Sequence, residues 1–150
     1  MKGGSLMKEK ILPIFALLGG LLSSAVGGFD YGFQSLLICM GIDYVSGLCV
    51  AGIFHKSTKS ESGALKSSEC FRGLVKKCMI IGIVAVGHRI DGVVGTTFIR
   101  DGMVIGFMLN EVISIVENVG LMGLPLPKIV VKAIDLLRSK AGEDDEKPKA

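Results

Sequence analysis

Long apolar segments separated by short polar stretches dominate the chain. Four of these segments are long enough to cross a membrane: residues 11–29, 33–54, 78–99 and 102–120. A helix rises about 1.5 Å per residue, so about 20 residues cross the roughly 30 Å hydrocarbon core of a bilayer. The pattern therefore predicts an all-α protein, an integral membrane helical bundle of about four transmembrane helices that form one domain over residues 1–120.

A different pattern follows the fourth segment. Pro125 and Pro127 lack backbone N–H donors and disfavour helix in the residues before them, so a helix break is expected here. Over residues 121–140, apolar and charged positions then alternate with helical spacing, which predicts a C-terminal amphipathic helix that is interfacial or self-associating on the cytoplasmic side. Residues 141–150 read as a charged, disordered tail.

Composition supports the membrane interpretation. The mean hydropathy is +0.56 and 49% of the residues are hydrophobic, which is high for a soluble domain. Four cysteines show no metal-binding or redox spacing and are interpreted as reduced packing residues, so no metal site is expected. The net charge of +3 is too small to suggest a nucleic-acid partner.

The distribution of charge predicts an orientation. Of the 17 basic residues, 15 lie in the N-terminal segment, in a loop at residues 55–77, or after residue 120. Because cytoplasmic segments of membrane proteins are enriched in Lys and Arg, these three regions should share the cytoplasmic side. Four spans satisfy that requirement, with both termini and the loop 55–77 in the cytoplasm of a bacterial cell.

Polar residues inside the predicted spans are the candidate functional residues. In the fourth span they fall within an arc of about 120° on a helical wheel, which we call the polar stripe. The candidates for pore lining or assembly are Asp43, Gly47, Asp91 and the polar stripe, made of Asn110, Glu111, Ser114, Glu117 and Asn118. Intramembrane ionisable groups of this kind line water or ion paths, relay protons, or form structural ion pairs.

Both roles stay open at Asp43 and Glu111. For His88 and Arg89 the structural role is favoured, for example an ion pair of Arg89 with Asp91 or Glu111. Glu117 lies close enough to the end of its span to be simply interfacial.

Small residues in the first span predict close helix packing. They form two neighbouring rows, one of Gly19, Ser23 and Gly27 and one of Gly20, Ser24 and Gly28. Rows of small residues let helices approach closely in a membrane. The contact could be made within one subunit or between subunits.

Catalytic motifs are missing from the sequence. No nucleophile is paired with a recognisable base, and no phosphate-binding loop is present. His88 near Asp91 alone is weak evidence for an active site. We therefore expect a protein that is not an enzyme and that uses no cofactor.

The sequence resembles the toxin-secretion and phage-lysis holin family, whose members include small multi-span holins of low-GC bacteria and their phages and the clostridial toxin-export holin. The similarity covers roughly residues 35–138 and rests on "DYVSG" from Asp43 to Gly47, the basic loop, and "NEVISIVENVGLMGLPLPK". The positions that match are Asp43, Gly47, Glu111, Ser114, Glu117, Asn118, Pro125 and Pro127.

The resemblance implies a cytoplasmic-membrane protein that forms homo-oligomers and permeabilises the bilayer. An endolysin would then reach the cell wall, or a large protein toxin would leave the cell. Met1 and Met7 could both start translation, as in holins that also make a longer inhibitory product, an antiholin; alternatively Met7 is only an internal residue.

Two other functions are open at this stage. A small ion- or proton-coupled transporter or channel would use Asp43 and Glu111 to bind its substrate. A purely structural membrane subunit would use the same residues for packing, and its expression should not harm the cell.

Overall fold

The computed structural model describes residues 3–58 and 64–143, and every regular element in this part of the chain is a helix. There are five, in the order α1 (Gly3–Val26), α2 (Tyr31–Gly52), α3 (Ser67–Val94), α4 (Phe98–Leu121) and α5 (Lys128–Glu143). Met1, proposed as the first of two starts, and residues 144–150 of the expected tail lie outside the described residues. The predicted all-α class is confirmed.

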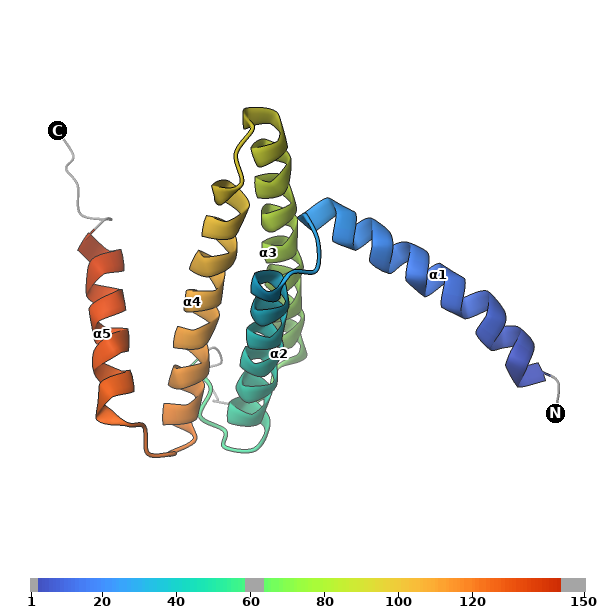
Figure 1. Ribbon diagram of the computed structural model, residues 1–150. Helices are drawn as coiled ribbons and strands as arrows, with labels where there is room; N and C mark the ends of the chain where they lie inside the picture. Colours follow the sequence, from blue (N-terminus) through green and yellow to red (C-terminus); the bar gives the residue numbers. More distant parts are fainter. Residues whose placement is uncertain (1–2, 59–63, 144–150) are drawn as a thin grey trace.

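Helices α2, α3 and α4 form a three-helix bundle, and α4 packs against both of the others (Figure 1). In the view of Figure 1, α2 runs downward, α3 returns upward, and α4 runs downward again. The loop between α2 and α3 and the end of α4 therefore lie at the same end of the bundle, which we call the loop end. The turn between α3 and α4 marks the opposite end, the turn end.

The inward positions recur at alternating spacings of three and four residues. In α2 the inward positions are Phe33, Leu36, Met40, Asp43, Gly47 and Val50. In α3 they are Lys77, Ile80, Val84, Gly87 and Asp91, and in α4 they are Arg100, Val104, Phe107, Glu111, Ser114 and Asn118. This spacing is that of helices packing at a shallow angle. The apolar members make the core near the turn end, and polar members concentrate toward the loop end.

The helix boundaries differ from the expected spans chiefly in α3. This helix begins at Ser67, whereas the sequence placed residues up to 77 in a cytoplasmic loop and began the span at 78. It ends at Val94 rather than 99, because Gly95 adopts a left-handed conformation with φ 76°. Lys77 is thereby part of the bundle instead of part of the loop.

The surface of the bundle is largely apolar. Ile38, Val45 and Val93 have exposed fractions of 62%, 58% and 88%, whereas the charged residues Asp91 and Glu111 are both only 4% exposed. Helices α2 and α4 are long and apolar enough to cross a membrane, judged by length and composition. Four membrane spans remain a proposal.

The first and last helices lie apart from the bundle. Helix α1 contacts α3 near its own C-terminus and then projects away (Figure 1). Residues 11–22 of α1 are exposed, and a Cβ added at Gly19 or Gly20 would meet nothing within 4 Å. Helix α5 stands on the α4 side, and Lys128, Ile129 and residues 131–133 on it are exposed.

Helices α3 and α4 approach each other closely at Gly87. Among the glycines whose surroundings are described, Gly87 has the closest contacts between these two helices. A Cβ at this position would lie 2.5 Å from Met103 Sδ and 3.3 Å from the Cα atom of Arg100. Gly82, on the same helix, has nothing within 4 Å of such an atom. A side chain at position 87 must therefore push the two helices apart.

We predict that Gly87→Leu destabilises the bundle by about 1–3 kcal/mol, the usual cost of overpacking. The free energy of unfolding, measured in detergent micelles by circular dichroism, checks this value. Gly82→Leu is the matched control and should change it little. Equal effects of the two substitutions would contradict the close approach.

Candidate functional site: an ionic cluster in the helix bundle

Three charged residues, one from each bundle helix, meet in the interior. The Lys77 Nζ of α3 donates to Asp43 Oδ2 of α2 at 2.9 Å and to Glu111 Oε2 of α4 at 2.5 Å. The exposed fractions of the three side chains are 12%, 14% and 6% in the order Lys77, Asp43 and Glu111. We call these residues the ionic triad.

Neutral polar groups complete the bonding of Asp43. Asn118 of α4 donates through Nδ2 to Asp43 Oδ1 at 3.2 Å and to Ser46 Oγ at 2.9 Å. Both carboxylate oxygens of Asp43 are thus hydrogen-bonded. Among the described residues, no buried side-chain nitrogen or oxygen lacks a partner, which is the condition under which buried charges are tolerated.

A cavity of about 270 Å³ lies beside the ionic triad and extends toward the loop end. Its walls include Gly47, Asn110, Ser114 and Lys76, together with residues of the loop after α2. Two carboxylates facing one ammonium give the triad an excess of one negative charge when all three groups are ionised. The cavity is therefore acidic beside the triad, and the other charged residues of its lining are Lys66, Glu69 and Lys76.

Most of the predicted site residues converge on this cavity. Six of the candidates line it: Asp43, Gly47, Asn110, Glu111, Ser114 and Asn118. Glu117 is exposed on α4 and does not line the cavity, in keeping with its interfacial alternative. The polar stripe of α4 thus faces α2 and α3 for most of its length.

Asp91 belongs to a different cluster, at the turn end. Its carboxylate accepts hydrogen bonds from Thr96 Oγ1 at 2.5 Å and from the backbone N–H groups of Ile99 and Arg100 at 3.1 and 2.8 Å. These N–H groups belong to the first turn of α4, which has no partners of its own within the helix. Asp91 caps α4, and no ion pair joins it to Arg89 in the described part of the chain.

The side chain of Arg100, at the start of α4, bonds to the end of α1 and to the start of α2 at the turn end. Its Nε donates to Val26 O at 2.6 Å, its Nη2 to Gly28 O at 3.2 Å, and its Nη1 to the carboxylates of Asp30 and Asp101 at 2.5 and 2.9 Å. Asp30 in turn caps α2 by accepting from Phe33 N at 2.8 Å. The Arg100 guanidinium is the main reason why the pKa of Asp30 lies below its ordinary value of 3.8.

Of the two small-residue rows, only the C-terminal members meet other parts of the described chain. Gly27 and Gly28 adopt φ angles of 84° and 108° where α1 ends, and a Cβ on Gly27 would lie 2.6 Å from His88 Nδ1. Gly19, Gly20, Ser23 and Ser24 lie on the projecting part of α1. Whether these four pack against another subunit stays a prediction.

The sequence interpretation missed Lys77 and Arg100. Lys77 was assigned to the basic loop, and Arg100 fell between the third and fourth predicted spans, because both lie next to apolar runs. One signal was available: Lys77, Val84 and Asp91 recur every seven residues and therefore share one face of a helix. No group of three or more potential metal ligands occurs among the described residues.

Residues 20–139 match the sequence profile of the bacteriophage holin family. The chain belongs to this family. The resemblance found from the sequence is therefore confirmed, and membership points to a holin-like membrane protein that is not an enzyme. No catalytic family is indicated.

Relatives of similar length occur in Listeria, Bacillus and Clostridium species. The chain is 35% identical to the uncharacterised protein Lmo0128 of Listeria monocytogenes, over 92% of this chain and 95% of the relative. It is 31% identical to the uncharacterised protein YtkC of Bacillus subtilis, over 88% and 96% respectively. An uncharacterised 14.9 kDa protein of Clostridium perfringens is 30% identical over 82% and 89%. No solved structure matches the chain.

The ionic triad should contribute strongly to stability as a unit. Lys77→Met leaves two buried carboxylates without their cation, so we expect the free energy of unfolding to fall by about 3–5 kcal/mol. The triple variant D43N/K77M/E111Q removes all three charges and should recover most of this loss. Unfolding in detergent micelles measures both values, with Lys76→Met as the control for loss of a neighbouring exposed lysine. Additive losses in the triple variant would contradict the triad.

The Asp30–Arg100 pair predicts a pH dependence. Because the folded-state pKa of Asp30 is lowered, its stabilising effect is complete well above pH 3.8 and is lost as the pH falls through the folded-state pKa. The stability difference between wild type and Asp30→Asn should therefore be constant near neutral pH and shrink in acid. Asn retains the capping geometry, so the comparison isolates the charge. Thermal unfolding at several pH values in micelles measures it.

Proposed function

We propose that this protein is a holin of the bacterial cytoplasmic membrane. In this proposal α1 to α4 cross the bilayer, both termini and the loop after α2 are cytoplasmic, and α5 lies at the cytoplasmic interface. Subunits assemble into homo-oligomers that permeabilise the membrane and release an endolysin or export a large protein toxin. A longer or shorter translation product could act as an antiholin.

The single observation that carries the proposal is the ionic triad within a bundle that has an apolar surface. Asp43 is the 13th of 22 residues in α2, and Glu111 is the 14th of 24 in α4. If these two helices span the bilayer, the triad lies near its midplane, where unpaired charges are costly. Lys77 supplies the pairing that allows such a bundle to exist as a closed subunit.

The same groups give a physical route to opening. In a closed subunit the triad is satisfied internally, and its members are shielded from lipid. When helices of neighbouring subunits separate and water enters, the carboxylates and the ammonium can be hydrated instead of paired. The ion pairs thus resist opening in a single subunit, while the hydrated state becomes available once an assembly encloses a lumen. The polar stripe of α4 would then line that lumen.

The direct test is expression in a bacterium together with a cytoplasmic endolysin that lacks a signal sequence, with turbidity followed over time. Abrupt lysis after a delay, which requires both proteins, supports holin activity. Continued growth with normal amounts of the protein in the membrane would refute it. Endolysin activity in the culture medium provides a second readout.

Variants of the triad sharpen this test. Lys77→Met raises the free energy of the closed subunit, so lysis should begin earlier than in wild type. The triple variant D43N/K77M/E111Q should delay lysis, because an uncharged layer gains little from hydration. Lys76→Met is the matched control, and membrane amounts are compared by immunoblot. If Lys77→Met and Lys76→Met lyse at the same time with equal amounts in the membrane, the triad does not set the timing.

One observation favours a second candidate, an ion- or proton-coupled transporter. The acidic part of the cavity beside the triad lies close to the position where transporters bind their coupling ions. Flux of small ions through proteoliposomes, abolished by Asp43→Asn and without leakage of an enclosed protein, would support the transporter over the holin. Leakage of the enclosed protein would support the holin.

A further inference from the structure

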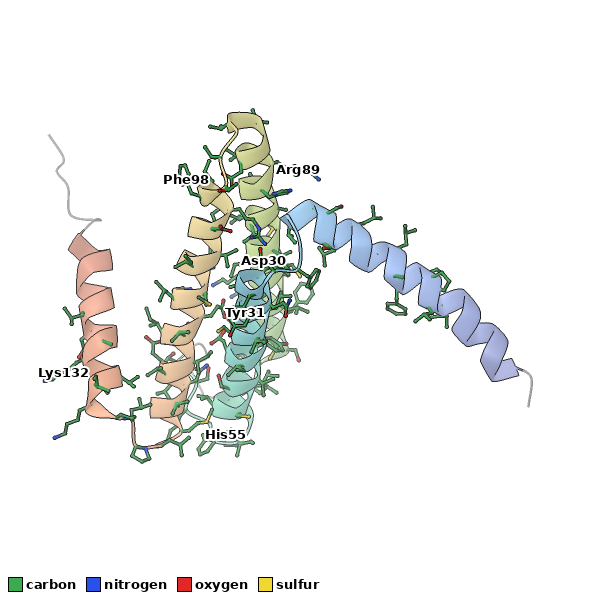
Figure 2. The ribbon with its side chains drawn as sticks, viewed as in Figure 1. Asp30, Tyr31, His55, Arg89, Phe98 and Lys132 are labelled. Atoms are coloured by element: carbon green, nitrogen blue, oxygen red, sulfur yellow. The ribbon has the colours of Figure 1, made fainter. Side chains whose placement is uncertain are left out.

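Arg89 lies near the turn end of α3, and its contacts differ from those of the two titratable residues closest to it in the sequence. Asp91 is buried and caps α4, and His88 faces Gly27. The side chain of Arg89 is exposed, and within the described part of the chain no hydrogen bond or ion pair satisfies it. Figure 2 labels Arg89 on α3, close to the C-terminal end of α1.

An apolar groove of about 390 Å³ runs beside Arg89, between α1 and α3. It is lined by Ala25 of α1 and by Ala85, Val86, Ile90 and Val93 of α3. Arg89 is its one charged wall residue. Val86 and Val93 have exposed fractions of 56% and 88%, so these apolar walls are open to the surroundings rather than packed within the chain.

The depth of Arg89 follows from the helix rise. Arg89 lies 12 residues beyond Lys77 along α3, which corresponds to about 18 Å. With the triad near the midplane, the outer edge of the hydrocarbon lies about 15 Å away. The guanidinium would therefore be at the level of the outer headgroups. The part of the groove formed by Ala85 and Val86 would be at the level of the acyl chains, and the part formed by Ile90 and Val93 would lie beyond Arg89. This step rests on the membrane topology proposed above.

We propose that the groove and Arg89 together bind an anionic phospholipid from the outer leaflet. An acyl chain occupies the part of the groove beside Ala85 and Val86, and the lipid phosphate accepts hydrogen bonds from the guanidinium. The planar fork of donors in arginine matches phosphate geometry, and an arginine in an apolar setting requires an anionic partner. The acyl chain covers apolar side chains that are otherwise exposed, and the phosphate is the counter-ion of Arg89.

The test is native mass spectrometry of the full chain, released from micelles that contain equal amounts of phosphatidylglycerol and phosphatidylcholine. We expect wild type to retain phosphatidylglycerol preferentially. Arg89→Gln should reduce that retention about tenfold, the loss expected for hydrogen bonds to a charged group. Arg72→Gln is the control, because Arg72 is an exposed arginine of the same helix that already pairs with Glu69 at 2.9 Å.

Two further arms separate the alternatives. Val86→Trp fills the groove without touching the charge and should also lower lipid retention; helical content measured by circular dichroism verifies that each variant folds. Glycerol phosphate, which offers the anion without the acyl chain, should fail to displace the lipid. Equal retention in Arg89→Gln and wild type, complete displacement by glycerol phosphate, or a groove occupied by a second copy of the chain would each overturn the proposal. None of these readouts depends on lysis, so a failure of the holin proposal would be seen separately.

Discussion

The structure depends on the placement of one lysine between two carboxylates. Asp43, Lys77 and Glu111 come from three different helices, and each is supplied with its counter-charge by another helix. In an apolar environment Lys77 offsets the desolvation of both carboxylates, and Asp43 also accepts a hydrogen bond from Asn118. These ionic contacts therefore fix the register of α2, α3 and α4 relative to one another. The apolar packing around Phe33 and Val104 also stabilises the bundle, but it specifies the register less strictly.

At the turn end, helix capping fixes the positions of the helices relative to one another. Asp30 caps α2 and Asp91 caps α4, and the Arg100 guanidinium joins these helix starts to the end of α1. Both helix N-termini, which carry partial positive charge, thus meet carboxylates. Different interactions thus stabilise the two halves of the bundle. Toward the loop end these are ion pairs beside a cavity, and at the turn end they are capped helix termini and the buried Arg100.

The sequence predicted the helices well because long apolar runs and proline breaks are local signals. It also placed Glu111, Ser114 and Asn118 on one face of the fourth span, because of their helical spacing, and named Asp43 as a candidate in another span; that these residues meet in space was not predicted. Lys77 was missed because a lysine at the edge of an apolar run has the same local appearance whether it lies in water or in a bundle. Its position depends on two partners distant in the sequence, 34 residues before and 34 residues after it. The capping contacts of Asp91 were not predicted for the same reason, because the N–H groups that it caps belong to the next helix.

The mutual dependence within the triad also constrains how such a chain can diverge. Loss of Lys77 leaves two carboxylates in the bundle without a cation, whereas loss of one carboxylate leaves a balanced ion pair with Lys77. Evolutionary paths that begin with the loss of Lys77 therefore pass through intermediates that fold poorly, and paths that begin with the loss of a carboxylate do not. Positions 43, 77 and 111 should consequently be epistatic, with position 77 changing only after one of the two carboxylates has been lost.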